Sequence, residues 1–383
     1  MTQSRVVRFC LASLGGGAFL VGILLLARFA SERRFLAVLG PLEPGAYTRP
    51  PVNSGTNAAR YFLAACGKLR VKAEQAQILA DWDGKEPTPQ LVALVQQNEA
   101  SLRLAMQAAS LKESFYGLDY SSGFATSLPD LPKLVALGRL LALGALVAKS
   151  RGEIGRAVTT LGALGSLAAS LEREPGLSPF TAGLLLERLQ LIGVTVVFFD
   201  PSFPRKLASE LLQSLSQEPL LQGFTRVVGL EEASLRQALV ARQGWTTFLA
   251  ETWVRWRSSE RALSLAGLAA KPTTSWCRRL QDGRVENQEF RLLATLAQAQ
   301  GVTTSRVLVA TGLTLALHAG NHGKVPKSLG LYPEATKPSC FIGELMEFVE
   351  TSACLHVPGG RKLWQKLELP RPSPPFSLCL SGF

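Results

Sequence analysis

The longest uncharged stretch of the sequence lies near its N-terminus. Nineteen consecutive residues, from Phe9 to Ala27, carry no charge, and arginines flank the stretch on both sides. A helix of this length rises about 28 Å, close to the roughly 30 Å thickness of the hydrocarbon core of a bilayer. The pattern therefore predicts a single transmembrane anchor within residues 1–39. A cleaved signal peptide and a buried core helix are the competing interpretations.

A linker and then a long region of helical periodicity follow the predicted anchor. Residues 40–56 contain four prolines and three glycines and predict the linker. From residue 57 to residue 331, apolar side chains recur at helical spacing, and capping residues such as Asn57 and Thr88 stand at predicted helix starts. The predicted helices cover residues 57–69, 88–109, 129–149, 154–171, 178–198, 203–216, 228–242, 245–262, 285–299 and 303–319.

A helical hairpin of the tetratricopeptide type is predicted between Leu134 and Pro175. Small residues occupy positions at which its two helices would approach closely, and they are Gly138, Ala142, Gly152 and Ala157. A true repeat array requires a second copy at a period of about 34 residues, and the sequence contains no clean second copy. The predicted fold class is therefore all-α, with an N-terminal transmembrane helix followed by an irregular helical body.

Composition excludes several classes of protein. Hydrophobic residues make up 47% of the chain and charged residues only 18%, which excludes a disordered chain, a coiled-coil rod and a collagen. The formal net charge of +12 permits an acidic partner or surface without identifying one. The six cysteines show no Cys-x-x-Cys spacing. Cys340 and Cys354 fit either a disulfide across a short loop or two separate buried thiols.

The charges that flank the predicted anchor leave its orientation nearly balanced. Arg5 and Arg8 precede the uncharged stretch, and Arg28, Arg33 and Arg34 follow it. A short N-terminal flank before a large body is typical of a signal-anchor protein, which places the body outside the cytoplasm. We therefore expect a single-pass protein of the inner, cytoplasmic membrane with a periplasmic body.

Residues that carry catalytic or metal chemistry are scarce. The sequence has three histidines, His318, His322 and His356, and the first two are spaced four apart as in zinc-binding helices. Gly320 and Gly323 instead predict a helix end, where a histidine interacts favourably with the helix dipole. The sequence has no nucleophile elbow, no phosphate-binding loop and no dinucleotide fingerprint. No catalytic, cofactor-binding or metal-binding residue is therefore assigned, and a non-catalytic role is favoured over an enzymatic one.

A cluster of tryptophans and arginines provides the candidate partner-binding residues, Trp253, Trp256, Arg255 and Arg257. Tryptophan and arginine dominate interface hot spots when they are exposed, and they also suit anionic lipid headgroups. The alternative is that the tryptophans belong to the core while the arginines are solvated. We expect a protein partner and no nucleic acid, because a membrane-tethered body outside the cytoplasm rarely meets nucleic acid.

The stretch RVLVATGLTLALHAGNHGKVPKSLGL, at residues 306–331, carries a family resemblance. A helix rich in leucine and small residues ends in a motif formed by His322, Gly323, Pro326, Ser328 and Leu329. This pattern resembles uncharacterised single-pass, helix-rich bacterial envelope proteins, and the motif is similar to one in the pseudopilins of type II secretion. The resemblance implies architecture and location only. After Leu331 the chain departs from that group, and an irregular, proline-rich tail is predicted over residues 332–383.

Together these features predict a membrane-anchored helical interaction or scaffolding protein of the cell envelope. An envelope hydrolase, with a site formed by residues distant in sequence, is the first alternative. An accessory component of a secretion or pilus machine is the second.

Overall fold

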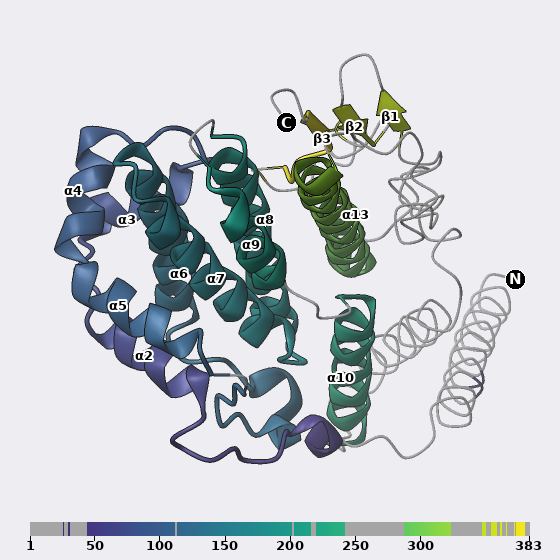
Figure 1. Cartoon of the computed structure of the whole chain (residues 1–383). Helices are drawn as coiled ribbons and strands as arrows, with labels where there is room; N and C mark the ends of the chain where they lie inside the picture. The colour runs from purple at the N-terminus through teal and green to yellow at the C-terminus, as the bar shows by residue number, and fades with distance from the viewer. Residues whose placement is uncertain are drawn as a thin grey trace, which may run out of the picture. The chain divides into compact units, whose positions relative to one another are not determined.

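The computed structural model describes most of the chain between residues 44 and 322 and parts of the C-terminal region (Figure 1). The chain divides into a larger unit, residues 49–118, 127–227 and 272–383, and a smaller unit, residues 1–48, 119–126 and 228–271. Helices dominate the described part, in agreement with the predicted all-α class. The described residues are 44–111, 113–200, 203–215, 220–241, 287–322, 347–349, 354–357 and 373–379, together with single positions such as Arg371.

Four short helices open the larger unit: α2, Ala58–Gly67; α3, Ala73–Asp81; α4, Pro89–Gln97; and α5, Glu99–Ala108. The predicted caps are confirmed, because Asn57 accepts a hydrogen bond from the Ala59 N–H and Thr88 accepts one from the Leu91 N–H. The prediction of a single helix over residues 88–109 is wrong, because the helix is interrupted at Asn98, between α4 and α5. The buried Asn98 side chain accepts from the Arg70 N–H at 2.7 Å and donates to the Arg70 carbonyl at 3.2 Å, which holds this break in place.

Three long helices form the centre of the larger unit: α6, Leu131–Ser150; α7, Ile154–Glu172; and α8, Leu177–Phe198. Figure 1 shows them side by side, and leucines such as Leu137 and Leu164 are fully buried between them. The helices α6 and α7 are the predicted hairpin. Gly152 joins them with a φ of 77°, a conformation that a residue with a Cβ adopts only at a cost.

The central helices α6, α7 and α8 are long and apolar enough to cross a membrane, by length and composition alone. The prediction of one candidate span is therefore wrong as a count. The predicted anchor itself, residues 9–27, lies outside the described residues apart from Leu26. The protein itself buries 67% of the apolar window of α6 and 72% of those of α7 and α8. An apolar helix has the same composition whether protein or lipid surrounds it, so the sequence pattern did not separate the two cases.

Further helices follow the central three. They are η3, Arg205–Leu207; α9, Ala208–Ser214; and α10, Leu220–Ala241. The chain is described again at α13, Asn287–His322, which packs against α8. Two helices were predicted here, and the structure instead has one that runs through Gly301. The helix continues past Gly320, and the second predicted stop residue, Gly323, lies outside the described residues.

A small antiparallel sheet lies beside α13 (Figure 1). Its strands are β1, Glu347–Val349; β2, Cys354–His356; and β3, Ser377–Cys379, and β2 lies in the middle. The irregular tail predicted over residues 332–383 is therefore wrong at these positions. Leu355 and Leu378 are buried against α13 at Gly312, and this packing, which no local pattern reveals, stabilises the strands.

Two short 3-10 helices, η1, Pro44–Tyr47, and η2, Tyr120–Ala125, belong to the smaller unit. Thr48, which directly follows η1, is hydrogen-bonded to Asp119 and Tyr120 at the start of η2. The Thr48 hydroxyl donates to Asp119 Oδ1 at 3.3 Å and accepts from the Tyr120 N–H at 3.0 Å.

Candidate functional site

A cavity of about 610 Å³ lies in the larger unit between α6, α8 and α13. Its volume is within the range of small-molecule sites, roughly 300–1,000 Å³. Both apolar and polar side chains line it. The lining residues are Val135 and Arg139 of α6; Leu177, Ser178, Thr181, Ala182, Leu185 and Arg188 of α8; Ala294, Thr295 and Gln298 of α13; and Arg371.

Three arginines from three segments line this cavity, whereas the described lining residues include no carboxylate. Arg188 is only 1% exposed, in the middle of the apolar helix α8. Arg139 donates from Nη1 to the main-chain carbonyls of Leu79 and Ala80. The charges of Arg139 and Arg188 repel one another, and the Asp81 carboxylate attracts Arg139. The described lining thus carries three cationic side chains and no anionic one, which favours an anion.

A buried ion pair holds α8 against α13 beside this cavity. Arg306 donates from Nε to Glu187 Oε1 at 2.5 Å and from Nη2 to Glu187 Oε2 at 2.6 Å, and Glu187 is wholly buried. A two-pronged bond of this kind restricts both the rotation and the sliding of the two helices. Because Arg188 directly follows Glu187, the ion pair also positions the backbone that carries the cavity arginine.

The rest of the lining combines apolar surface with hydrogen-bonding groups. Val135, Leu177 and Leu185 provide apolar wall. Gln298 is 4% exposed, and its Oε1 has no hydrogen-bond partner among the described residues. The lining of described residues contains no histidine, cysteine or carboxylate that would act as a general base. The arrangement thus suits the binding and orientation of a ligand with an anionic group and an apolar part.

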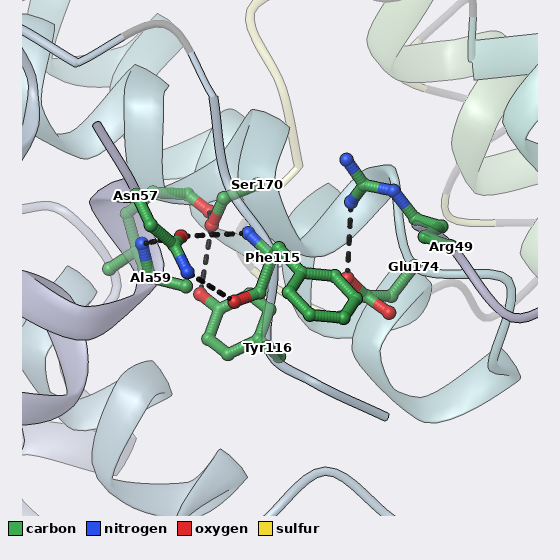
Figure 2. A network of polar contacts seen from close by, with 8 residues as sticks. Arg49, Asn57, Ala59, Phe115, Tyr116, Ser170 and Glu174 are labelled. Carbon is green, nitrogen blue, oxygen red and sulfur yellow. Dashed lines mark hydrogen bonds and ion pairs between the residues drawn. The ribbon is translucent and has the colours of Figure 1, made fainter. Parts of the chain in front are cut away.

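A second polar cluster lies where the start of α2 meets the loop at residues 113–116 (Figure 2). Asn57 is its centre. Its Oδ1 accepts from the main-chain N–H groups of Ala59 at 3.1 Å and Phe115 at 2.9 Å, and its Nδ2 donates to the Phe115 carbonyl at 2.8 Å. These bonds occupy the amide and tie the loop to the helix start, which is a structural role.

Tyr116, Ser170 and an ion pair between Arg49 and Glu174 complete this cluster (Figure 2). The Ser170 hydroxyl donates its one hydrogen to the Leu167 carbonyl at 2.7 Å, so Tyr116 must donate to Ser170 across their 2.9 Å contact. Burial raises the pKa of Tyr116, which keeps its hydroxyl protonated as that donor. A serine engaged in this way is not activated as a nucleophile, so the cluster provides no support for the hydrolase alternative.

The residues predicted from the sequence to bind a partner, Trp253, Trp256, Arg255 and Arg257, lie outside the described part of the chain. His318 and His322 lie in the last turns of α13, and His356 lies in β2. Within the residues that the structure describes, no group of three or more histidine, cysteine or acidic side chains is placed to hold a metal ion.

The cavity residues were not among the candidates that the sequence suggested. The sequence did contain a signal for two of them, because Arg139 and Arg188 are charged residues in the middle of strongly apolar helices, and such charges are commonly functional or paired. Arg371 has no comparable signal. It stands in the proline-rich segment, and only the folded chain brings it to the cavity.

No protein-family model, curated protein or solved structure matches this chain. The resemblance to envelope proteins and to the pseudopilin motif therefore stays a prediction from the sequence.

Proposed function

We propose that the chain is a membrane-associated helical binding protein of the cell envelope, which holds an anionic ligand with an apolar part in the cavity between α6, α8 and α13. The observation that carries this proposal is the convergence of Arg139, Arg188 and Arg371 on one cavity. The body acts as an interaction module rather than an enzyme. Trp253, Trp256, Arg255 and Arg257 remain its predicted contacts with a protein partner.

The chemistry of the lining defines the ligand class. Guanidinium groups bind carboxylates and phosphates through paired, charge-assisted hydrogen bonds. An anion beside Arg139 and Arg188 offsets their mutual repulsion. The apolar wall at Val135, Leu177 and Leu185 accommodates a hydrocarbon group. A small carboxylate or phosphate amphiphile combines the two features.

Three apolar helices are candidates for membrane association, and our finer proposal is a single N-terminal anchor at residues 9–27 with a periplasmic body. We propose that α6, α7 and α8 are the core of that body. The short helices α2 to α5 pack along α6, and they carry exposed charges such as Glu74 and Arg103. Lipid around α6 would surround those charged helices as well, at a high cost in free energy. Water is therefore the better solvent for the side of the body formed by α2 to α5.

Four soluble probes test the proposed ligand class: octanoate, octyl phosphate, octanol and inorganic phosphate. The full chain is purified in a neutral detergent, and its thermal unfolding is followed as each probe is added. We expect octanoate or octyl phosphate to raise the Tm. Octanol and inorganic phosphate are expected to bind at least about 10-fold more weakly, since charge-assisted hydrogen bonds contribute roughly 1.5–3 kcal/mol and the apolar contacts add to them. The two amphiphiles distinguish a carboxylate from a phosphate head.

Arg371→Gln is the sharpest variant for this experiment. Arg371 is exposed, so its loss is expected to weaken amphiphile binding about 10-fold while the Tm without ligand stays unchanged. Arg103→Gln is the matched control, because Arg103 is exposed on α5, which does not line the cavity. Equal binding of octanol and octanoate, or full binding by Arg371→Gln, would contradict the proposal.

A further inference from the structure

The C-terminal sheet places two cysteines of the chain directly opposite one another. The strands β2 and β3 pair antiparallel, and the register sets Cys354 against Cys379, Leu355 against Leu378 and His356 against Ser377. Residues that face one another across an antiparallel pair lie on the same face of the sheet. The backbone therefore brings together two cysteines separated by 24 residues in sequence.

The hydrogen-bond pattern shows which kind of cross-strand pair the cysteines form. The Val357 N–H donates to the Phe376 carbonyl at 2.9 Å, and these two residues continue the register of β2 and β3 by one position. Val357 and Phe376 are thus a hydrogen-bonded pair. Because the two kinds of pair alternate, Cys354 and Cys379, three positions further, are a non-hydrogen-bonded pair.

Non-hydrogen-bonded pairs have the shorter backbone separation. Their Cα atoms lie about 4.5 Å apart, which falls within the range of roughly 4.4–6.8 Å that disulfides require. We infer that Cys354 and Cys379 form a cross-strand disulfide that closes the C-terminal sheet. From the sequence alone, Cys340 and Cys354 fit either a disulfide with each other or two separate buried thiols. Cys340 lies outside the described residues, and the register provides Cys379 instead.

Formation of the Cys354–Cys379 disulfide needs an oxidant that accepts two electrons. The two thiols lose two protons and two electrons as the sulfur–sulfur bond forms, and a disulfide of glutathione or of a partner oxidoreductase is reduced to two thiols. An oxidising compartment such as the periplasm supplies such disulfides, whereas the cytosol keeps thiols reduced. The bond encloses the segment that carries Arg371, which lines the cavity.

Peptide mapping of the full chain distinguishes the two possible pairings. The protein is equilibrated with oxidised glutathione, free thiols are blocked with iodoacetamide, and trypsin digestion follows without reductant. Trypsin leaves Lys337-Pro338 uncut, so Cys340 and Cys354 share the peptide 328–361, whereas Cys379 belongs to the peptide 367–383. A Cys354–Cys379 disulfide links two peptides, and a Cys340–Cys354 disulfide stays within one.

We expect the cross-linked pair of peptides from the parent protein and from Cys340→Ser. We expect its loss in Cys354→Ser and in Cys379→Ser, each of which leaves the remaining thiol open to iodoacetamide or glutathione. The inference is overturned if both cysteines of the parent protein are alkylated after oxidation, or if the internal Cys340–Cys354 bridge forms instead.

Discussion

Charged side chains inside the larger unit are held by specific partners. Glu187 is wholly buried and receives two hydrogen bonds from Arg306, and Glu174, which is 2% exposed, pairs with Arg49 at 3.2 Å. A buried carboxylate without a cation would keep its full desolvation cost. At the scale of single residues, these pairs decide which substitutions the body tolerates.

Removal of Arg306 is expected to be among the most damaging single changes to the body. Arg306→Met leaves the Glu187 carboxylate buried beside a neutral group, and loss of one partner of a buried pair costs about 3–5 kcal/mol. The free energy of unfolding in denaturant measures this loss. Arg156→Gln is the matched control, since its pair with Glu99 is exposed and such pairs contribute at most about 1 kcal/mol. Equal losses in the two variants would contradict the role given to the buried pair.

The buried thiol of Cys66 is expected to lower the free energy of unfolding at high pH. Burial raises the pKa of this thiol from 9.0 to about 12, Asp130 adds to the shift, and Lys133 opposes it. The folded-state pKa of Cys66 lies above that of the unfolded chain. The stability that the buried, protonated thiol contributes to the fold is therefore complete below about pH 9 and is lost as the pH rises toward 12. Iodoacetamide at pH 8 should therefore label Cys66 only after denaturation.

The same cysteine allows a second measurement. The free energy of unfolding should fall between pH 8 and pH 10.5 by less in Cys66→Ala than in the parent protein, because alanine has no thiol to ionise. Peptide-resolved labelling of native Cys66 at the rate of the denatured chain would show that the thiol is accessible and that this interpretation is wrong.

At the scale of elements, glycines set the distances between the central helices. A Cβ on Gly183 of α8 would lie 2.6 Å from Glu172 Cγ and 2.9 Å from the Ala168 carbonyl oxygen of α7. A Cβ on Gly138 of α6 would lie 2.6 Å from Leu186 Cδ1 of α8. The helices thus approach so closely that no side chain fits between them at these positions.

Gly183→Ala is therefore expected to destabilise the body by about 1–3 kcal/mol, because a main-chain oxygen cannot move aside as a flexible side chain does. Gly155→Ala, on α7, is the control, since a Cβ there meets nothing within 4 Å. It should be neutral or stabilise by up to about 1 kcal/mol through helix propensity. Thermal unfolding of the two variants checks the difference. A stable Gly183→Ala protein would mean that α7 and α8 separate more easily than their packing indicates.

At the scale of the whole molecule, the question is which segment holds the chain in a membrane. We expect the full chain to stay with membranes after high-salt and carbonate washing, and a chain that starts at Gly40 to be soluble. The free energy of transferring nineteen uncharged residues makes insertion of residues 9–27 effectively permanent. Membrane fractionation followed by immunodetection measures the retention of the full chain and the solubility of the chain that starts at Gly40.

Each other outcome of this fractionation has a definite meaning. Retention of the chain that starts at Gly40 would indicate that α6, α7 and α8 span the membrane, and the proposal that they are a water-soluble core would be wrong. Recovery of a mature N-terminus near Ser31 would show that the predicted anchor is a cleaved signal peptide.

Local chemistry determined much of this protein from its sequence. The caps at Asn57 and Thr88 depend only on neighbours within a few residues, so they were predictable. The all-α class follows in the same way from the periodicity of apolar residues. The residues next to a helix end in the sequence determine where the helix starts or stops.

Long-range packing decided the rest. Asn98 breaks a helix because Arg70 lies within reach, and the C-terminal strands form because Leu355 and Leu378 pack on α13. The cavity arginines and the pair of Cys354 with Cys379 are likewise contacts between segments far apart in sequence. Such contacts depend on how the connecting loops close and on the volumes of side chains that meet only in the folded state, and no local pattern encodes either.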